Sequence, residues 1–214
     1  MPIKLGIVPV TPFEQNCSIL VCQETGDAAV VDPGGDIEKI LDGVNQMSGT
    51  VKKILLTHGH LDHCAAAKDL SDQLGVPIEG PQEDERFWID QLPEQTVRFG
   101  FEHAKVFEPN RWLNDGDHVQ VGNVDLDVLH CPGHTPGHVV FYDKEDRLAI
   151  VGDVLFAGSI GRTDFPRGNH ADLIHAIKTK LWPLGDDVQF VPGHGPMSTF
   201  GNERKTNPYV GDKA

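Results

Sequence analysis

The segment Thr57-His58-Gly59-His60-Leu61-Asp62-His63 is the feature that most constrains this chain. It places four potential metal ligands close together, directly after the apolar run 51–56. Imidazole nitrogens and carboxylate oxygens are suitable ligands for zinc, iron and manganese. A loop at the end of a strand can turn such side chains toward one point, whereas alternate side chains of a strand diverge. The spacing therefore predicts a metal site at the end of a β-strand.

The apolar pattern predicts two successive α/β halves. In the first half, strands are expected at 5–10, 17–22, 28–31, 53–56 and 76–80, and helices after Asp36 and over 63–75. In the second half, strands are expected at 118–121, 124–129, 139–142, 148–151 and 188–191, with a helix after Asn169. Asp36 and Asn169 are expected to cap their helices, because their side chains can accept hydrogen bonds from free backbone N–H groups. The segment 81–111 has a weaker pattern, which predicts one helix near 83–91.

The order of these elements favours two sheets that pack against each other, with helices on the outside. A chain of 214 residues is long enough to bury a core as one large domain. Because no linker rich in proline, glycine or serine separates the halves, a single domain is expected over residues 1–214.

Composition and charge exclude several classes of protein. With 39% hydrophobic and 23% charged residues, the chain is typical of a water-soluble globular protein. It lacks the apolar stretch of about 18 residues that crosses a bilayer. The first six residues do not resemble an export segment, so a cytoplasmic location is expected. The formal charge of −14 repels phosphate backbones, which argues against a nucleic-acid partner.

The four cysteines, Cys17, Cys22, Cys64 and Cys131, form no C-x-x-C pair. Free thiols are therefore expected, as in proteins of a reducing compartment. Cys64 and Cys131 lie beside potential metal ligands, and a thiolate can bind zinc. The favoured interpretation is that both are small buried hydrophobic residues.

Three later segments repeat one arrangement, in which a potential ligand follows an apolar strand beside glycine or proline. They are V-L-H-C-P-G-H-T-P-G-H at 128–138, L-A-I-V-G-D at 148–153 and F-V-P-G-H-G at 190–195. Glycine permits the tight turns that aim one side chain into a shared site. Each segment is weak evidence alone, but together with the first motif they indicate one composite metal centre.

In this order, the four motifs resemble the metallo-β-lactamase superfamily, and in particular its glyoxalase II (hydroxyacylglutathione hydrolase) branch, over about residues 1–200. The resemblance implies an α/β (α+β) fold, a four-layer αββα sandwich with a two-metal site at the edge of the sheets. It also implies the ligands. The first metal would be held by His58, His60 and His134, and the second by Asp62, His63 and His194, with Asp153 bridging the two.

Two divalent cations are expected as cofactors, with zinc first and iron or manganese as alternatives. Because neutral imidazoles supply most of the ligands, much of the positive charge would remain to hold hydroxide. A bound cation lowers the pKa of water from about 15.7 toward 7.

The resemblance does not imply the other histidines as ligands. His130 and His138 flank His134 and could either orient a ligand or have a structural role. Surface or helix positions without a role are expected for the remainder, namely His103, His118, His170 and His175.

The resemblance implies hydrolysis of a thioester such as S-lactoylglutathione, the type II glyoxalase step of methylglyoxal detoxification. A metal-bridging hydroxide would attack the acyl carbonyl, and Asp62 would orient it and could take up its proton. A thiolate leaves readily, so no separate general acid is required. The expected partner is therefore a small-molecule thioester, with no role for nucleic acid or membrane.

This chain differs from familiar glyoxalase II enzymes in the region that would hold glutathione. Familiar glyoxalase II enzymes carry a helical C-terminal region with basic residues, whereas only 20 residues follow His194 here. No separate glutathione-binding helical domain is expected. Arg162 and Arg167 are the candidates for substrate contacts, with Arg204 and Lys205 as further possibilities, because carboxylates require cationic partners. Solvated surface charges are the alternative interpretation of these residues.

A second candidate function belongs to a different class of enzyme. The segment Ser159–Phe165 resembles persulfide dioxygenases, which use one iron and oxygen on glutathione persulfide. In that case His58, His60, His134 and Asp153 would hold the iron. Hydrolysis of β-lactams is disfavoured because no export segment is evident, and RNA processing is disfavoured by the net charge. The intact ligand set argues against a non-enzymatic relative. The metal, the acyl group and the oligomeric state stay open.

Overall fold

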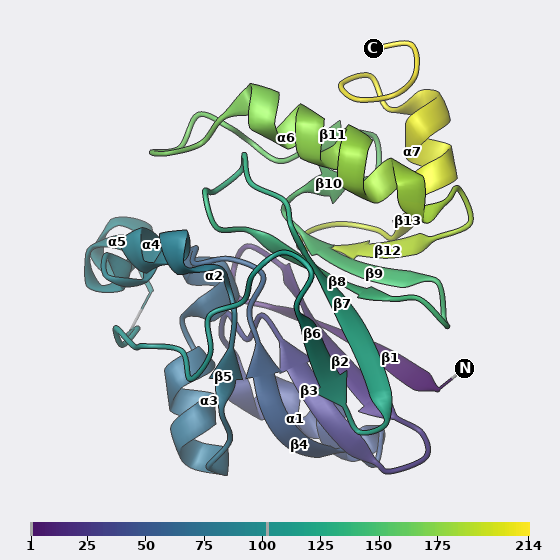
Figure 1. Cartoon of the computed structure of the whole chain (residues 1–214). Coiled ribbons are helices and arrows are strands. Elements are labelled where there is room, and N and C mark those ends of the chain that lie inside the picture. The colour runs from purple at the N-terminus through teal and green to yellow at the C-terminus, as the bar shows by residue number, and fades with distance from the viewer. Residues whose placement is uncertain (1, 102) are drawn as a thin grey trace.

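The computed structural model describes residues 2–101 and 103–214 and has two β-sheets at its centre (Figure 1). The first sheet has the order β1 (Ile3–Val10), β2 (Gln15–Cys22), β3 (Asp27–Val31), β4 (Thr50–Leu55) and β5 (Ile78–Glu79). β1, β2 and β3 are antiparallel neighbours, whereas β3, β4 and β5 are parallel. The parallel pairs follow from their connections, because a helix carries the chain back between successive strands.

The second sheet has the order β13 (Ser198–Thr199), β12 (Gln189–Pro192), β9 (Leu148–Gly152), β8 (Val139–Asp143), β7 (Val124–His130) and β6 (His118–Val121). β6 to β9 form an antiparallel meander, and β12 pairs with β9 in parallel. A small hairpin of β10 (Leu155–Phe156) and β11 (Ser159–Ile160) follows β9. In each half, a strand that follows a helix pairs in parallel with its neighbour in the sheet.

Short helices join these strands. They are α1 (Ile37–Gln46), α2 (Leu61–Cys64), α3 (Ala67–Leu74), α4 (Arg86–Ile89), α5 (Leu92–Phe99), α6 (His170–Ala176) and α7 (Phe200–Thr206), with the helical turns η1 (Glu83–Glu85), η2 (Ile177–Leu181) and η3 (Trp182–Leu184). In the described part of the chain, no helix has the length and apolar character needed to cross a membrane.

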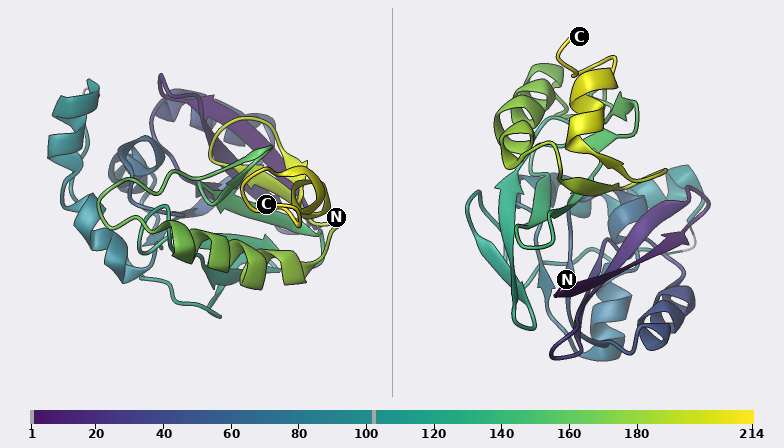
Figure 2. Two further views of the ribbon diagram at one scale, coloured as in Figure 1. Left: turned by 90° about the horizontal axis from the view of Figure 1, so that it is seen from above. Right: turned by 90° about the vertical axis from the view of Figure 1, so that its right-hand side faces the viewer.

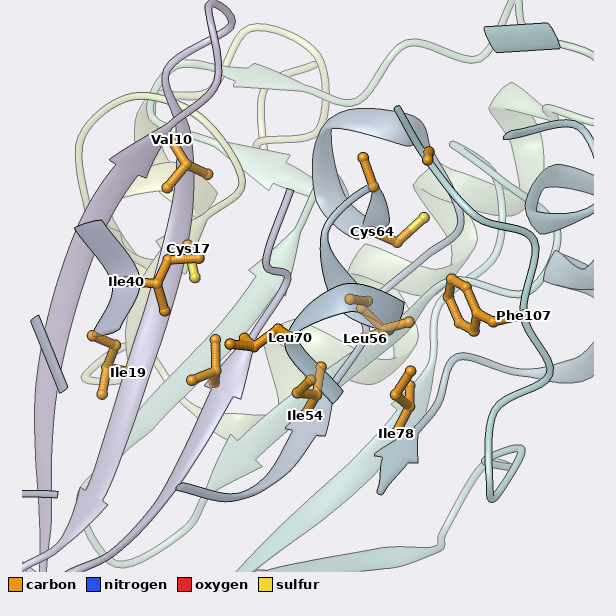
Figure 3. Close-up of a cluster of buried hydrophobic side chains, with 14 of the residues drawn as sticks. Val10, Cys17, Ile19, Ile40, Ile54, Leu56, Cys64, Leu70, Ile78 and Phe107 are labelled. Atoms are coloured by element: carbon orange, nitrogen blue, oxygen red, sulfur yellow. The ribbon is translucent and has the colours of Figure 1, made fainter. Parts of the chain in front are cut away.

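Three apolar clusters separate four layers. Ile19 points to the outer face of the first sheet, where it packs with Ile40 of α1 and Leu70 of α3 (Figure 3). Its neighbour Leu20 points the other way, into a cluster shared with Phe141 of the second sheet. This opposition follows from the alternation of side chains along a strand. The two sheets thus share a central core.

The third cluster packs helices on the outer face of the second sheet. It joins Leu173 of α6 and Phe200 of α7 to Phe190 of β12. Figure 2 shows that α6 and α7 lie on the opposite side of the two sheets from α1 and α3. The expected four-layer αββα sandwich is therefore confirmed.

Local predictions from helix-capping patterns had mixed outcomes. Asn169 caps α6 as expected, since its side chain accepts hydrogen bonds from the N–H groups of Ala171 and Asp172. The capping role predicted for Asp36 is wrong. Its backbone is left-handed, with φ 49°, and its side chain makes no capping bond. The Asp36 carboxylate instead accepts the backbone N–H of Thr11 at 3.0 Å, which ties α1 to the loop between β1 and β2.

The helix expected over 63–75 is divided into α2 and α3. Ala66 lies between them, and its N–H donates to the carbonyl of Pro33 at 3.1 Å, outside either helix. A tertiary hydrogen bond therefore takes the place of a helical one at this point. As a result, α2 is a short element that carries the last residues of the metal-binding motif, Leu61, Asp62 and His63.

Candidate metal centre

The seven predicted metal ligands lie in or directly after loops that leave β4, β7, β9 and β12. Backbone hydrogen bonds bring these loops together, both between the two sheets and within the second sheet. The N–H of Val139 donates to the carbonyl of Thr57 at 2.8 Å, and the N–H of Gly193 donates to the carbonyl of Gly152 at 2.7 Å. Segments far apart in the sequence thus meet at one edge of the sandwich.

The first group consists of His58, His60 and His134, all of them buried. Nδ1 of His60 lies 3.1 Å from Nε2 of His58 and 3.0 Å from Nε2 of His134. The remaining nitrogens of two rings have partners of their own. Nδ1 of His134 donates to the carbonyl of Arg162 at 2.8 Å, and Nδ1 of His58 lies 3.1 Å from the hydroxyl of Thr57. These contacts leave both Nε2 atoms unprotonated and facing the centre of the group.

The second group consists of Asp62, His63 and His194. Oδ2 of Asp62 lies 3.1 Å from Nε2 of His194 and 3.8 Å from Nε2 of His63. The rings are again held from behind. Nδ1 of His63 donates to Asp32 at 2.9 Å, and Nδ1 of His194 donates to the carbonyl of Phe13 at 3.1 Å.

Asp153 lies between the two groups. Its Oδ1 is 3.4 Å from Nε2 of His63, in the second group. Its Oδ2 is 3.4 Å from Nε2 of His134, in the first group, and 3.9 Å from Nε2 of His194. One carboxylate therefore faces donors of both groups, as the predicted bridging role requires.

Buried polar atoms without partners show that these residues fit cations. Within the described chain, Nε2 of His63 and Oδ1 of Asp153 are buried and make no hydrogen bond. A buried polar group left unsatisfied costs about 1–3 kcal/mol. A divalent cation would satisfy both atoms, and the nitrogen and oxygen donors are those that zinc, iron or manganese accepts.

The protonation states also suit a cation. Burial and the neighbouring histidines hold the pKa of His58 well below its usual range, so this ring is neutral. Burial opposes ionisation of Asp153, but the surrounding imidazoles of His63, His134 and His194 nevertheless hold its pKa well below that of an ordinary carboxyl. Burial by itself lowers the pKa of His63, yet the adjacent Asp153 and Asp62 carboxylates raise it well above normal. A cation bound beside these carboxylates would oppose protonation of His63.

Asp32 is a functional residue that the sequence reasoning missed. It is buried, its φ is 54°, and it accepts hydrogen bonds from the backbone N–H of Thr57 at 2.7 Å and from its hydroxyl at 2.5 Å. Through Thr57 and His63 it orients ligands of both groups. A polar residue directly after the buried strand β3, beside β4 in the sheet, was the signal that could have identified it.

His138 and His130 have different roles. His138 is fully buried, and its Nε2 accepts the backbone N–H of Asp153 at 3.0 Å. Its ring also stacks on His58, with centroids 4.6 Å apart. His138 therefore supports the ligands. His130 instead bonds to the carbonyl of Pro136 at 2.9 Å and holds a turn. The four histidines without motif support, His103, His118, His170 and His175, are all exposed.

The loop that carries the predicted substrate residues borders the first group. Arg162 and Arg167 are both exposed. The Arg162 guanidinium pairs with Asp164 at 2.8 Å and lies over the ring of Phe165, whose centroid is 4.8 Å from that of His60. Arg167 lies 4.0 Å over the ring of Phe87.

The two other basic candidates lie on α7. Arg204 forms ion pairs with Asp186 and Asp212. It thus holds the C-terminal segment in place. Lys205, also on this helix, is exposed.

The cysteines are buried and lie outside both groups of described ligands. Burial raises the pKa of Cys131 to about 12 and that of Cys64 well above normal. Both thiols therefore stay protonated at neutral pH, and a protonated thiol is a poor metal ligand. Figure 3 shows Cys64 among aliphatic side chains, which agrees with the hydrophobic role favoured for it.

The fold and the paired donor groups are those of a metallo-hydrolase, and the chain belongs to the metallo-β-lactamase superfamily, whose family model matches residues 10–194. It is 45% identical over 212 residues to the hydroxyacylglutathione hydrolase GloC of Haemophilus influenzae, covering 99% of this chain and 100% of that protein. The superfamily inferred from the four motifs is therefore confirmed.

Two solved structures are similar over nearly their whole length. The BLEG-1 B3 metallo-β-lactamase superposes with a TM-score of 0.89 and 32% identity, covering 97% of this chain and 99% of that one. TTHA1623 in a di-iron-bound form gives a TM-score of 0.87 and 33% identity, covering 96% and 100%. Divalent metals are thus expected at this site. GloC is named as a hydroxyacylglutathione hydrolase and BLEG-1 as a β-lactamase, so these relatives indicate no single substrate.

Proposed function

We propose that the protein is a thioester hydrolase that cleaves S-lactoylglutathione or a closely related glutathione thioester, the type II glyoxalase reaction of methylglyoxal detoxification. The observation that carries the proposal is the pair of three-donor groups that share Asp153. The full-length similarity to GloC supports the choice of substrate.

The metal ligands are part of the proposal. His58, His60 and His134 would hold one cation, Asp62, His63 and His194 would hold the other, and Asp153 would contact both. Zinc, iron or manganese bound there would supply a water of lowered pKa and would polarise the acyl carbonyl.

Asp62 is the residue that the proposal assigns as proton acceptor. Its carboxylate is partly exposed, and its Oδ2 contacts Nε2 of His194 at 3.1 Å. The neighbouring His63 and His194 more than offset the effect of burial and lower the pKa of Asp62. An ionised carboxylate in this place can orient the attacking water and take up its proton. The leaving thiolate requires no acid, because a thiol pKa of about 8.5 makes it a stable anion.

Substrate recognition would fall to the loop beside the first group. Glutathione carries two carboxylates, and Arg162 and Arg167 place two guanidinium groups on this loop. Guanidinium and carboxylate form strong paired hydrogen bonds. The ring of Phe165 lies between Arg162 and His60 and offers an apolar contact near the reacting centre.

The proposal thus names a small molecule as partner and assigns no part to nucleic acid or membrane. It also places the protein in the cytoplasm, which agrees with its four unpaired cysteines.

A persulfide dioxygenase reaction is the second candidate. It is favoured by the placement of Ser159–Phe165, the segment that resembles those enzymes. The Arg162 carbonyl in this segment receives the hydrogen bond of His134, and Phe165 packs against His60. In this reaction the first group and Asp153 would hold one iron.

Metal analysis combined with three assays tests these alternatives. The purified protein is loaded in turn with zinc, iron and manganese. It is then supplied with S-lactoylglutathione, with glutathione persulfide under oxygen, or with a cephalosporin. The proposal expects two metals per chain and thioester cleavage. One iron per chain with oxygen uptake would establish the dioxygenase instead, and turnover of the cephalosporin alone would point to a β-lactamase.

A further inference from the structure

Glu85 is a fully buried carboxylate at the end of η1, outside both donor groups. It accepts two backbone hydrogen bonds, one on each oxygen. The N–H of Gly59 donates to its Oε2 at 2.7 Å, and the N–H of Gly137 donates to its Oε1 at 2.7 Å. A buried carboxylate with both oxygens bound to loop backbone indicates a specific role in holding those loops.

The two loops are those that supply the first group. Gly59 stands between His58 and His60, and Gly137 stands between His134 and His138. His60 and His134 are 74 positions apart, yet their ring nitrogens lie 3.0 Å from each other. Glu85 is therefore a direct link between the two stretches of chain that must stay in register for three imidazoles to converge.

Close packing reinforces this link. A Cβ atom on Gly59 would lie 3.1 Å from Oε2 of Glu85 and 2.9 Å from Cβ of Trp88. A Cβ atom on Gly137 would lie 2.8 Å from Cγ of Glu85. Both loops thus approach the helical segment as closely as glycine allows. The N–H of Gln82 adds a third bond, to the carbonyl of Gly137 at 3.1 Å.

The same segment also contacts a ligand ring directly. Trp88 of α4 packs edge to face against His60, with ring centroids 4.5 Å apart. Figure 1 shows α4 on the same side of the molecule as α2, which carries the last residues of the first motif. The segment from Glu83 to Ile89 therefore forms a wall behind the first group.

The second group is held by other contacts. His63 is oriented by Asp32, and His194 is oriented by the carbonyl of Phe13. The two backbone bonds that Glu85 accepts come from Gly59 and Gly137, in the loops of the first group. Glu85 thus contacts the loops of the first group, whereas Asp32 reaches both groups, so a change at Glu85 should affect the two groups unequally.

We propose that Glu85 is a positioning residue for the first group, whose two oxygens set the distance between the loop of His58 and His60 and the loop of His134. This inference rests on the proposed metal centre. Glu85→Gln keeps the shape of the side chain but leaves only one acceptor oxygen, and its amide N–H₂ must face a backbone N–H. Loss of such a supporting hydrogen bond weakens metal binding by about 10–100-fold.

Zinc titration of the metal-free proteins by calorimetry tests the proposal. His134→Ala identifies the binding event of the first group, and Asp62→Ala identifies that of the second. Glu203→Gln is the matched control. Glu203 is also fully buried and accepts a backbone N–H, from Gly158 at 2.7 Å, but its other partners lie in the C-terminal segment.

For Glu85→Gln we expect first-group affinity to fall about 10–100-fold while second-group affinity changes less than about twofold. Glu203→Gln should change neither. Equal weakening of both events in Glu85→Gln, or no change in either, would overturn the positioning role. A general loss of stability cannot imitate the expected result, because it would weaken both events together.

Amide hydrogen exchange keeps the proposal testable if Glu85→Gln does not fold. In the metal-free native chain, the amides of Gly59 and Gly137 should be strongly protected. In Glu85→Asp, whose side chain is too short to reach both loops, at least one should exchange faster. Rapid exchange of both amides in the folded native chain would refute the link. A native chain that binds no zinc would overturn the metal centre and this inference together, whereas zinc binding without thioester cleavage would overturn only the proposed substrate.

Discussion

Nε2 of His63 lies 3.4 Å from Oδ1 of Asp153, and neither atom has a hydrogen-bond partner among the described residues. The first residue lies in α2, which follows β4, and the second directly follows β9, so the pair joins elements of the two sheets. Asp32 holds the other nitrogen of His63, and the backbone N–H of Asp153 donates to His138. Both side chains are thus fixed with their free atoms facing one another, an arrangement that a bound cation would complete.

Asp62→Ala tests the role of the second group. Removal of this carboxylate takes away a predicted ligand and the proposed proton acceptor. We expect the metal content to fall from two ions per chain to one, and the rate of thioester hydrolysis to fall by about 10²–10⁴-fold. Metal analysis and steady-state kinetics measure both effects. Asp72→Ala, at an exposed position on α3, is the control and should retain full activity. Unchanged hydrolysis in Asp62→Ala would contradict the two-metal mechanism.

His138→Ala should behave differently from His134→Ala. His138 supports Asp153 through one hydrogen bond and stacks on His58, whereas His134 presents its own nitrogen to the first group. We expect His138→Ala to lower the free energy of unfolding by about 1–3 kcal/mol, because it leaves the Asp153 N–H without a partner. It should retain most of its metal. His134→Ala should lose first-group metal, and equal metal loss in both variants would show that the ligand assignment is wrong.

Stability of the metal-free protein should depend on the protonation of Glu85. Burial raises the pKa of Glu85 to about 7, against an ordinary value of 4.5, although the N–H groups of Gly59 and Gly137 oppose this effect. Between these two values the folded state binds more protons than the unfolded state, so the free energy of unfolding falls as the pH rises. The contribution is about 3 kcal/mol, present at pH below 4.5 and lost as the pH passes 7.

Urea denaturation of the metal-free native chain and of Glu85→Gln, followed across this pH range, measures the effect. Glutamine does not titrate, so the variant should lack the contribution of Glu85. As the pH rises, the unfolding free energy of the native chain should therefore fall relative to that of Glu85→Gln. Parallel pH profiles would show that Glu85 does not titrate in this range.

Arg162→Ala and Arg167→Ala test the proposed glutathione contacts. Each change removes an exposed guanidinium from the loop beside the first group. We expect KM for S-lactoylglutathione to rise about 3- to 30-fold with little change in kcat, because each change removes a charge-assisted hydrogen bond that solvent weakens at an exposed site. Arg204→Ala is the matched control, since Arg204 pairs with Asp186 and Asp212. An unchanged KM in both loop variants would exclude these arginines from substrate binding.

The sequence by itself determined most of the strands, several of the helices and the side chains that gather in the two donor groups. It did not indicate α5, α7 or the hairpin of β10 and β11. The features that it did determine depend on local physics. Alternating apolar residues define the strands, and the glycines and prolines that follow them turn the chain so that His58, Asp153 and His194 leave the strand ends. Such signals lie within a few residues of one another. They could therefore be interpreted without knowing how the chain folds over long distances.

Only the tertiary structure decided how those side chains are supported. Asp32 meets Thr57 and His63, and Glu85 meets Gly59 and Gly137, across separations for which no local pattern exists. The error at Asp36 has the same cause. Its carboxylate had two possible uses, a local helix cap and a distant backbone N–H, and the packed structure offered the second. A polar side chain bonds to whichever partner the folded chain brings to it, and that choice is made between segments remote in sequence.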